Sequence, residues 1–133
     1  MLGSPLNMAP EVLNNLEYNN KVDIWSIGTV YYELLFGKPP FVAKNMVDLV
    51  KLIYNTPVAF DKKINNISAI AEDAIRKMLV VDPKKRIDWE ELFNHKINTY
   101  MEDKLKRELA DTMKGEEVEL NMSKFYIKNN MVI

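Results

Sequence analysis

The sequence predicts a mainly α-helical domain, and three observations carry this prediction. Residues 21–36 are apolar or aromatic almost all round, which is typical of a helix buried in a core. Two further segments, one over residues 46–55 and one after Ser68, place apolar residues at helical spacing. No strand pattern precedes residue 116.

Length, charge and composition exclude several classes of function. A chain of 133 residues with a net charge of −1 is expected to be one domain that does not bind nucleic acid electrostatically. It has no cysteine and one histidine, so neither disulfides nor a histidine cluster for a metal are expected. No secretory signal opens the sequence, and the apolar run at 21–36 is too short to span a membrane. These features predict a cytoplasmic, intracellular domain.

The segment 21–36 is predicted to be the central helix. Asn19 or Asn20 can cap its start, and Gly37, followed by two prolines, ends it. Asp23 lies in its first turn, where a buried carboxylate must be satisfied. Either the amides of the helix N-terminus satisfy it, or it ties down a distant backbone segment. The residues alone favour the helix N-terminus.

The remaining elements follow from local signals. Four short helices are predicted from proline, capping or spacing patterns: 10–13 after a proline-rich loop, 46–55 capped by Asn45, a helix capped by Ser68 and ended at Asp82-Pro83, and 89–94 capped by Asp88. A last helix is predicted from Thr99 to Lys114, lying on the domain or serving as a partner-binding or regulatory helix. Val118, Leu120 and Met122 alternate like a short strand or an extended docking segment.

Four motifs in order resemble the last third of a eukaryotic protein kinase domain. They are Gly-Ser-Pro-Leu-Asn-Met-Ala-Pro-Glu at 3–11, Asp-Ile-Trp-Ser-Ile-Gly at 23–28, Gly-Lys-Pro-Pro-Phe at 37–41 and Asp-Pro-Lys-Lys-Arg-Ile at 82–87. The resemblance implies the C-terminal helical lobe of the kinase fold, truncated and without an N-lobe. It implies a partial kinase domain over 1–98 and a helical or extended tail over 99–133. Gly-Ser-Pro at 3–5, Trp-Ser-Ile-Gly-Thr at 25–29 and Asp-Trp-Glu-Glu-Leu-Phe-Asn-His at 88–95 look most like those of the autophagy-initiating serine/threonine kinases.

The resemblance also implies roles for residues near the substrate. Ser4 would contact the catalytic aspartate and its neighbouring lysine, which identifies the serine/threonine class. Leu6 would line the pocket for the substrate residue that follows the phosphoacceptor. Asn7 departs from the family pattern, in which an aromatic residue is usual, and this departure puts the packing of the loop in question.

Two further roles concern the interior of the lobe. The family pairs Glu11 with Arg86, and the planar fork of Arg suits a carboxylate in two parallel hydrogen bonds. The family assigns Asp23 and Trp25 to the support of the catalytic loop, with the Asp23 carboxylate bound to backbone amides of that loop. Without the loop, part of the central helix would be uncovered, including some of Val22, Trp25, Ile27 and Val30, and self-association would follow.

The catalytic parts of a kinase are not found in the sequence. Glycine occurs only at 3, 28, 37 and 115, and there is no glycine-rich loop, His-Arg-Asp or Asp-Phe-Gly motif. We therefore expect no catalytic, cofactor or metal residues in this chain, although the complete family uses ATP and magnesium. Three hypotheses follow: a fragment of an active serine/threonine kinase, a non-catalytic module that binds a protein substrate or regulatory protein, or a decayed gene product that hardly folds.

Overall fold

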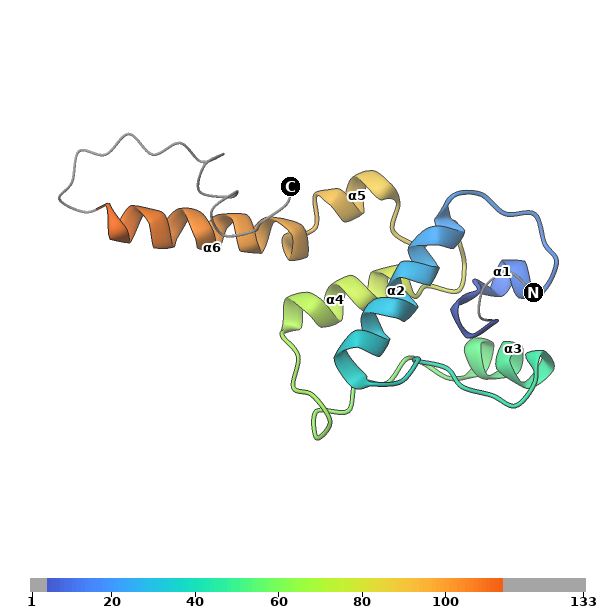
Figure 1. Ribbon diagram of the computed structural model, residues 1–133. Coiled ribbons are helices and arrows are strands. Elements are labelled where there is room, and N and C mark those ends of the chain that lie inside the picture. Colours follow the sequence, from blue (N-terminus) through green and yellow to red (C-terminus); the bar gives the residue numbers. More distant parts are fainter. Residues whose placement is uncertain (1–4, 114–133) are drawn as a thin grey trace. The chain divides into compact units, whose positions relative to one another are not determined.

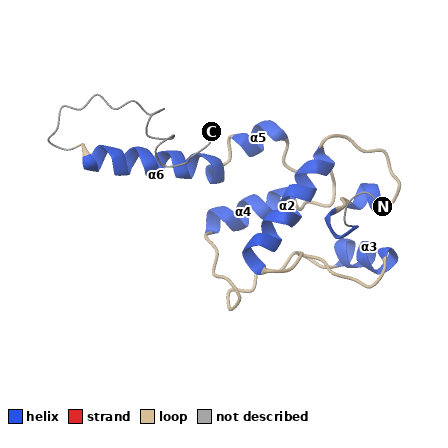
Figure 2. Ribbon diagram, viewed as in Figure 1, coloured by secondary structure: helices blue, strands red, loops and turns tan. Residues whose placement is uncertain are grey.

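The structure is a computed structural model that describes residues 5–113, and within them it contains helices and loops but no strand (Figures 1 and 2). The prediction of a mainly α-helical lobe is confirmed. The elements in chain order are η1 (Pro5–Asn7), α1 (Pro10–Leu13), α2 (Lys21–Phe36), α3 (Met46–Asn55), α4 (Ala69–Met78), α5 (Trp89–Phe93) and α6 (Lys96–Thr112). The chain forms two compact units, Met1–Thr99 and Tyr100–Ile133, and the boundary falls within α6.

Helix α2 is the centre of the first unit, and it packs against α4 and η1. Gly28 allows the close approach of α2 to α4, because a Cβ atom there would lie 2.9 Å from both Met78 Cβ and Leu79 Cδ2. Gly37 ends the helix with a φ of 79°, a conformation that glycine adopts without strain. The buried residues of α2 are Ile24, Trp25, Gly28, Thr29, Tyr32 and Phe36.

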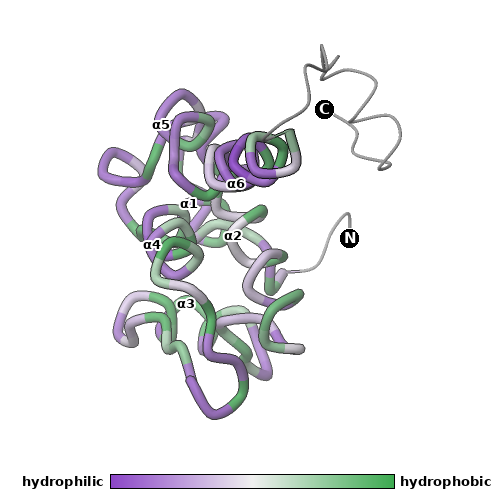
Figure 3. The backbone as a smooth tube through the Cα atoms, turned by 90° about the vertical axis from the view of Figure 1, so that its left-hand side faces the viewer, coloured by the Kyte–Doolittle hydropathy of each residue, from purple (hydrophilic) through white to green (hydrophobic). Residues whose placement is uncertain are grey.

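Part of α2 is uncovered, as the sequence predicted for some of Val22, Trp25, Ile27 and Val30, although Trp25 is buried. Ile27 and Val30 are each 44% exposed, and Leu34 is 79% exposed. The cause is that α4 and η1 contact one side of the helix, and nothing among residues 5–113 covers these three side chains. Val22 is half-buried and packs against the core. Figure 3 shows hydrophobic and hydrophilic residues alternating along the helices of this unit.

The predicted caps of three helices are confirmed. The side chains of Asn45, Ser68 and Asp88 accept hydrogen bonds from the backbone N–H of the residue three positions further on, which starts α3, α4 and α5. At α2 the N-cap residue Asn20 makes no side-chain cap hydrogen bond, and the Oδ1 atom of the preceding Asn19 accepts from the backbone N–H of Lys21 at 3.0 Å. These signals are local, so the sequence carries them directly.

The start of the last helix was predicted wrongly. Helix α6 begins at Lys96 rather than at Thr99, because the Nδ1 atom of the His95 ring accepts a hydrogen bond from the backbone N–H of Ile97 at 3.0 Å. The predicted end of this helix at Lys114 and Gly115 and the extended segment at 118–122 lie outside the described residues. No helix in the described part of the chain is long and apolar enough to cross a membrane.

An aromatic cluster fixes the loop between α3 and α4. Tyr32 and Phe36 stack with ring centroids 4.5 Å apart, and both contact Phe60 from this loop. The Tyr32 hydroxyl donates to the carbonyl oxygen of Ala59 at 2.6 Å, and Arg76 of α4 lies 4.6 Å from the centroid of the Phe60 ring. Helix α3 packs on α1 at the other side of the unit (Figure 1).

Candidate functional site

Arg86 and Glu11 form a buried ion pair. The side chain of Arg86 is 0% exposed and that of Glu11 is 4% exposed. Arg86 Nη1 donates to Glu11 Oε1 at 2.7 Å, and Nη2 donates to Oε2 at 2.9 Å. The two residues are 75 positions apart in the sequence, so this pair closes most of the first unit.

The remaining N–H groups of Arg86 bind backbone carbonyls. Nε donates to the Val80 carbonyl at 2.8 Å, Nη1 to the Lys21 carbonyl at 2.9 Å and Nη2 to the Val81 carbonyl at 3.2 Å. Together with Glu11, these acceptors use all five N–H donors of the guanidinium group. Arg86 therefore joins α1, the start of α2 and the loop after α4 in one arrangement. A lysine could not reproduce it, because an ammonium group has three donors and no fork.

Trp25 completes the buried side of this arrangement. Its side chain is almost fully buried, and the Arg86 guanidinium carbon lies 5.2 Å from the centroid of its ring. The ring also stacks on Phe41, with centroids 6.2 Å apart. Its indole Nε1–H has no hydrogen-bond partner in the described part of the chain. Trp25 thus lies beside the ion pair, on the buried face of α2.

The loop before α1 is docked on α2 through Asn7. Ser26 Oγ donates to the Asn7 carbonyl oxygen at 2.7 Å, and the Thr29 hydroxyl lies 3.0 Å from the oxygen of the Asn7 side chain. The buried Thr29 hydroxyl also lies 2.7 Å from the Ser26 carbonyl oxygen, so an aromatic side chain in place of Asn7 would remove one contact and leave that hydroxyl a hydrogen-bond partner. Leu6 is partly buried against the core. Ser4 lies outside the described residues.

Asp23 lies apart from the ion pair. Its side chain is exposed and forms no hydrogen bond with any other residue of the described range 5–113. It shares the solvent-exposed part of α2 with Ile27 and Val30. The structure therefore brings Glu11, Arg86 and Trp25 together and leaves Asp23 on the uncovered face.

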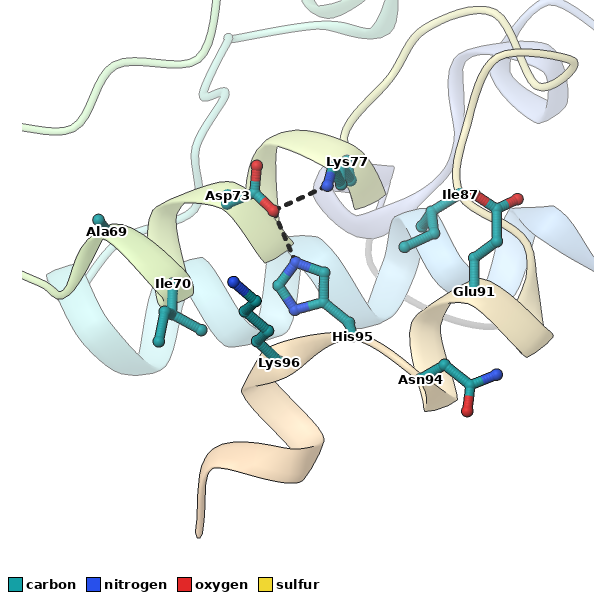
Figure 4. A pocket seen from close by; sticks show the side chains of 9 residues that line it. All are labelled: Ala69, Ile70, Asp73, Lys77, Ile87, Glu91, Asn94, His95 and Lys96. Atoms are coloured by element: carbon teal, nitrogen blue, oxygen red, sulfur yellow. Dashed lines mark hydrogen bonds and ion pairs between the residues drawn. The ribbon is translucent and has the colours of Figure 1, made fainter. Parts of the chain in front are cut away.

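A second group of polar side chains lines a hollow of 560 Å³ between α4 and the segment from α5 to the start of α6 (Figure 4). His95 Nε2 lies 2.7 Å from Asp73 Oδ2, and Lys77 Nζ lies 2.9 Å from the same oxygen. The hydrogen bond from His95, followed by that from Lys77, lowers the pKa of the Asp73 carboxyl. Among residues 5–113, no group of three or more His, Cys, Asp or Glu side chains could hold a metal ion.

Sequence reasoning missed one residue of the main site. Lys21 lies at the first position of α2, and its Nζ donates to the carbonyl oxygens of Pro83 at 3.0 Å and Arg86 at 2.9 Å. The only sequence signal is a lysine two positions before Asp23, and a lysine at a helix start is usually solvated. Its partners are 62 and 65 positions away, which no local pattern reveals.

Comparisons with known proteins show the family to which the chain belongs. The sequence model of the protein kinase domain matches residues 1–97. The chain is 43% identical over 100 residues to a protein of Candida glabrata named serine/threonine-protein kinase ATG1, covering 74% of this chain and 11% of that protein. It is 40% identical over 135 residues to the protein of that name from Saccharomyces cerevisiae, covering 100% of this chain and 14% of the relative. A Dictyostelium discoideum protein, serine/threonine-protein kinase atg1, is 40% identical over 94 residues, or 71% of this chain and 14% of its own length. The chain thus spans about a seventh or less of these relatives.

Proposed function

The chain belongs to the protein kinase family, and on that premise we propose that residues 1–98 are part of the C-terminal lobe of a serine/threonine kinase domain and residues 99–133 a tail that follows it. The complete domain would transfer the γ-phosphoryl group of ATP to a Ser or Thr hydroxyl of a protein. In this assignment the chain supplies the protein-substrate side of the active site. The other parts of a complete kinase domain would supply the catalytic loop and bind the ATP phosphates and the magnesium ions. We place this activity inside the cell.

The observation that carries this proposal is the Arg86–Glu11 pair. It fixes the C-terminal end of the loop that contains Leu6, while the Asn7 contacts fix the middle of that loop on α2. A loop held at two points, by a buried ion pair and by a partly buried hydrogen bond, is restrained, which is what the positioning of a substrate peptide requires. Ser4 and Leu6 are the residues we assign to the substrate, and Asp23 and Trp25 are those we assign to the catalytic-loop side.

A chimeric kinase tests the proposal. Residues 1–97 replace the aligned segment of the S. cerevisiae relative, whose similarity extends over this whole chain. We expect the chimera to phosphorylate Ser and Thr peptides. In the chimera, Leu6→Glu should change which residue is preferred after the phosphoacceptor. It should reduce autophosphorylation less than it reduces phosphorylation of the originally preferred peptide. A folded chimera that transfers no phosphate, while the unmodified relative does, would contradict the proposal.

The isolated chain is expected to bind no nucleotide. A kinase holds ATP through a glycine-rich loop, a strand lysine and metal-binding Asp and Asn residues, and none of these motifs is in the sequence. Calorimetric titration with an ATP analogue and magnesium checks this. Saturable binding at micromolar affinity would show that the chain has an ATP site of its own.

We further propose that the isolated chain self-associates through the exposed face of α2. Ile27, Val30 and Leu34 are spaced by three and four positions, which makes an apolar stripe of the kind that pairs helices. Sedimentation velocity should show dimers or larger species that Leu34→Glu converts to monomers. The control is Phe93→Glu, which changes an apolar residue on α5 that is 67% exposed, compared with 79% for Leu34. A monomeric parent chain would refute this part of the proposal.

A non-catalytic interaction module is the second candidate. The observation that favours it is the outer side of α3, where Met46, Val47 and Tyr54 are 44, 64 and 48% exposed. A partner protein with an apolar groove could cover these side chains. A blot of the native cell separates the candidates, since a stable species of 15.5 kDa favours the module and a band of full kinase-domain size or more favours the fragment.

A further inference from the structure

Lys21 forms hydrogen bonds with both the side chain and the backbone of Arg86. The carbonyl oxygen of Lys21 accepts from Arg86 Nη1 at 2.9 Å, and the ammonium group of Lys21 donates to the carbonyl oxygen of Arg86 at 2.9 Å. The same ammonium group donates to the Pro83 carbonyl at 3.0 Å. One residue at the start of α2 therefore holds both the guanidinium group and the backbone of Arg86.

The loop that carries Arg86 depends on these contacts. Its other backbone bonds run from the amides of Lys85 and Arg86 to the Asp82 carbonyl, at 3.0 Å each, and from the Ile87 amide to the Lys77 carbonyl of α4 at 3.2 Å. Within residues 5–113, the carbonyl oxygens of Pro83 and Arg86 accept hydrogen bonds from Lys21 alone. Removing the ammonium group would leave two partly buried acceptors to water, and the bond from Arg86 Nη1 to the Lys21 carbonyl would have to hold the loop on the start of α2 without them.

The Lys21 ammonium group lies beside other charged side chains. Glu17, Tyr18 and Lys84 line the solvent-facing hollow beside it. Asp88 lies close enough that the Lys21 charge helps to lower the pKa of its carboxyl, after the larger effect of the Glu91 backbone N–H. The Lys21 ammonium group thus has two carbonyl oxygens as hydrogen-bond partners and the Asp88 carboxylate nearby.

We infer that Lys21 is a positioning residue, which holds Arg86 in the place from which its guanidinium group binds Glu11 and covers the ring of Trp25. Lys21 contacts neither substrate nor nucleotide in this role. It acts through Arg86, and its effect passes to Glu11 and thereby to the loop that contains Leu6. The inference concerns the fold of the chain itself, so it does not depend on the activity of any chimera.

Trp25 provides the readout that a general loss of stability would not change. The Arg86 guanidinium group lies over its ring, so the near-ultraviolet circular dichroism of Trp25 in the folded state reports where that group is. The measurement uses the full chain with Trp89→Phe, because Trp89 is the other of its two tryptophans. Lys21→Met keeps the length of the side chain and removes its donors, and Lys21→Arg keeps charge and donors. Lys85→Met is the control, since Lys85 is an exposed lysine of the same loop.

We expect Lys21→Met to shift the folded-state signal of Trp25 toward that of Arg86→Lys and to raise the unfolding equilibrium constant at least about tenfold, since hydrogen bonds from a charged donor are among the stronger ones. Lys21→Arg should restore both, and Lys85→Met should change neither. The effect of Lys21→Met on the unfolding constant should be smaller when Glu11→Gln is also present, because the pair that Lys21 positions is then already weakened.

Either of two results would overturn the inference and leave Lys21 as an ordinary surface contact. One is an unchanged Trp25 signal in Lys21→Met. The other is a change in the unfolding equilibrium constant on Lys21→Met that is equally large with Glu11 and with Gln at position 11. If Lys21→Met does not fold, Lys21→Gln is measured instead, because its amide still donates to one of the two carbonyls. The same two readouts then decide.

Discussion

Replacing Arg86 is the most direct test of the buried site. Arg86→Ala removes the cation beside a Glu11 carboxylate whose side chain is only 4% exposed, and an uncompensated buried charge costs roughly 3–5 kcal/mol. Arg86→Lys keeps the charge but has three donors for five acceptors, so two hydrogen bonds are lost at about 0.5–1.5 kcal/mol each, or about 1–3 kcal/mol. Since a domain is stabilised by about 5–15 kcal/mol in total, the alanine variant should be close to unfolding.

Urea denaturation followed by circular dichroism at the helical band measures both changes. The lysine variant should unfold at a lower urea concentration than the parent, and the alanine variant at a lower one still. Lys85→Ala is the control, because it removes a neighbouring cation that is exposed. An Arg86→Ala variant within about 0.5 kcal/mol of the parent, the range of surface substitutions, would show that the pair is solvated and that the reasoning is wrong.

Three other predictions concern α2 and α4. Asp23→Asn should cost the isolated chain less than about 1 kcal/mol in a urea melt, because the carboxylate is exposed and has no partner within 5–113; a loss of several kcal/mol would show that residues outside that range bind it. Gly28→Ala should cost about 1–3 kcal/mol, because the new Cβ would lie 2.9 Å from Met78 Cβ, and a melting temperature equal to that of the parent would show that α4 yields without cost. Hydrogen bonds, of which the one from His95 has the largest effect, lower the pKa of the Asp73 carboxyl in the folded state. Asp73 therefore contributes fully to the free energy of unfolding above the unfolded pKa of about 3.9, and this contribution is lost as the pH falls through the lower folded pKa. The melting temperature of Asp73→Asn should therefore fall less steeply in that acid range than the parent's, and parallel profiles would contradict this.

Most of the helices could be predicted from the sequence because the signals that start and end them are local. The caps at Asn45, Ser68 and Asp88 each depend on residues three positions apart, and the structure confirms them. The start of α6 was missed because an imidazole ring supplies the cap, and His95 is not among the side chains that usually do so. Sequence rules therefore predict a helix start correctly where a usual capping side chain binds a backbone N–H within a few residues of it.

The site was less predictable, since its contacts join distant segments. The pairing of Glu11 with Arg86 came from the family pattern and from the shape of the Arg fork, and the distances that the structure gives could not be obtained from either. The roles of Asn7 and Lys21 depend on which segments lie together after folding, so no spacing rule indicated them. On α2 the predicted exposure of Ile27 and Val30 agrees with the structure, whereas Trp25, also named as a candidate for the uncovered face, is buried beside Arg86 and Phe41.

The separation of Glu11 and Arg86 has a consequence for folding rates. Closing a chain loop costs about 0.6 kcal/mol more for each doubling of its length, so a contact between residues 75 positions apart forms only after shorter-range contacts have brought its ends together. Its desolvation is also repaid only when all five acceptors are in place. We therefore expect the pair to form after the transition state for folding. Variants that weaken it should then unfold faster while folding at nearly the parental rate, so that Arg86 sets how long the folded lobe lasts rather than how quickly it is made.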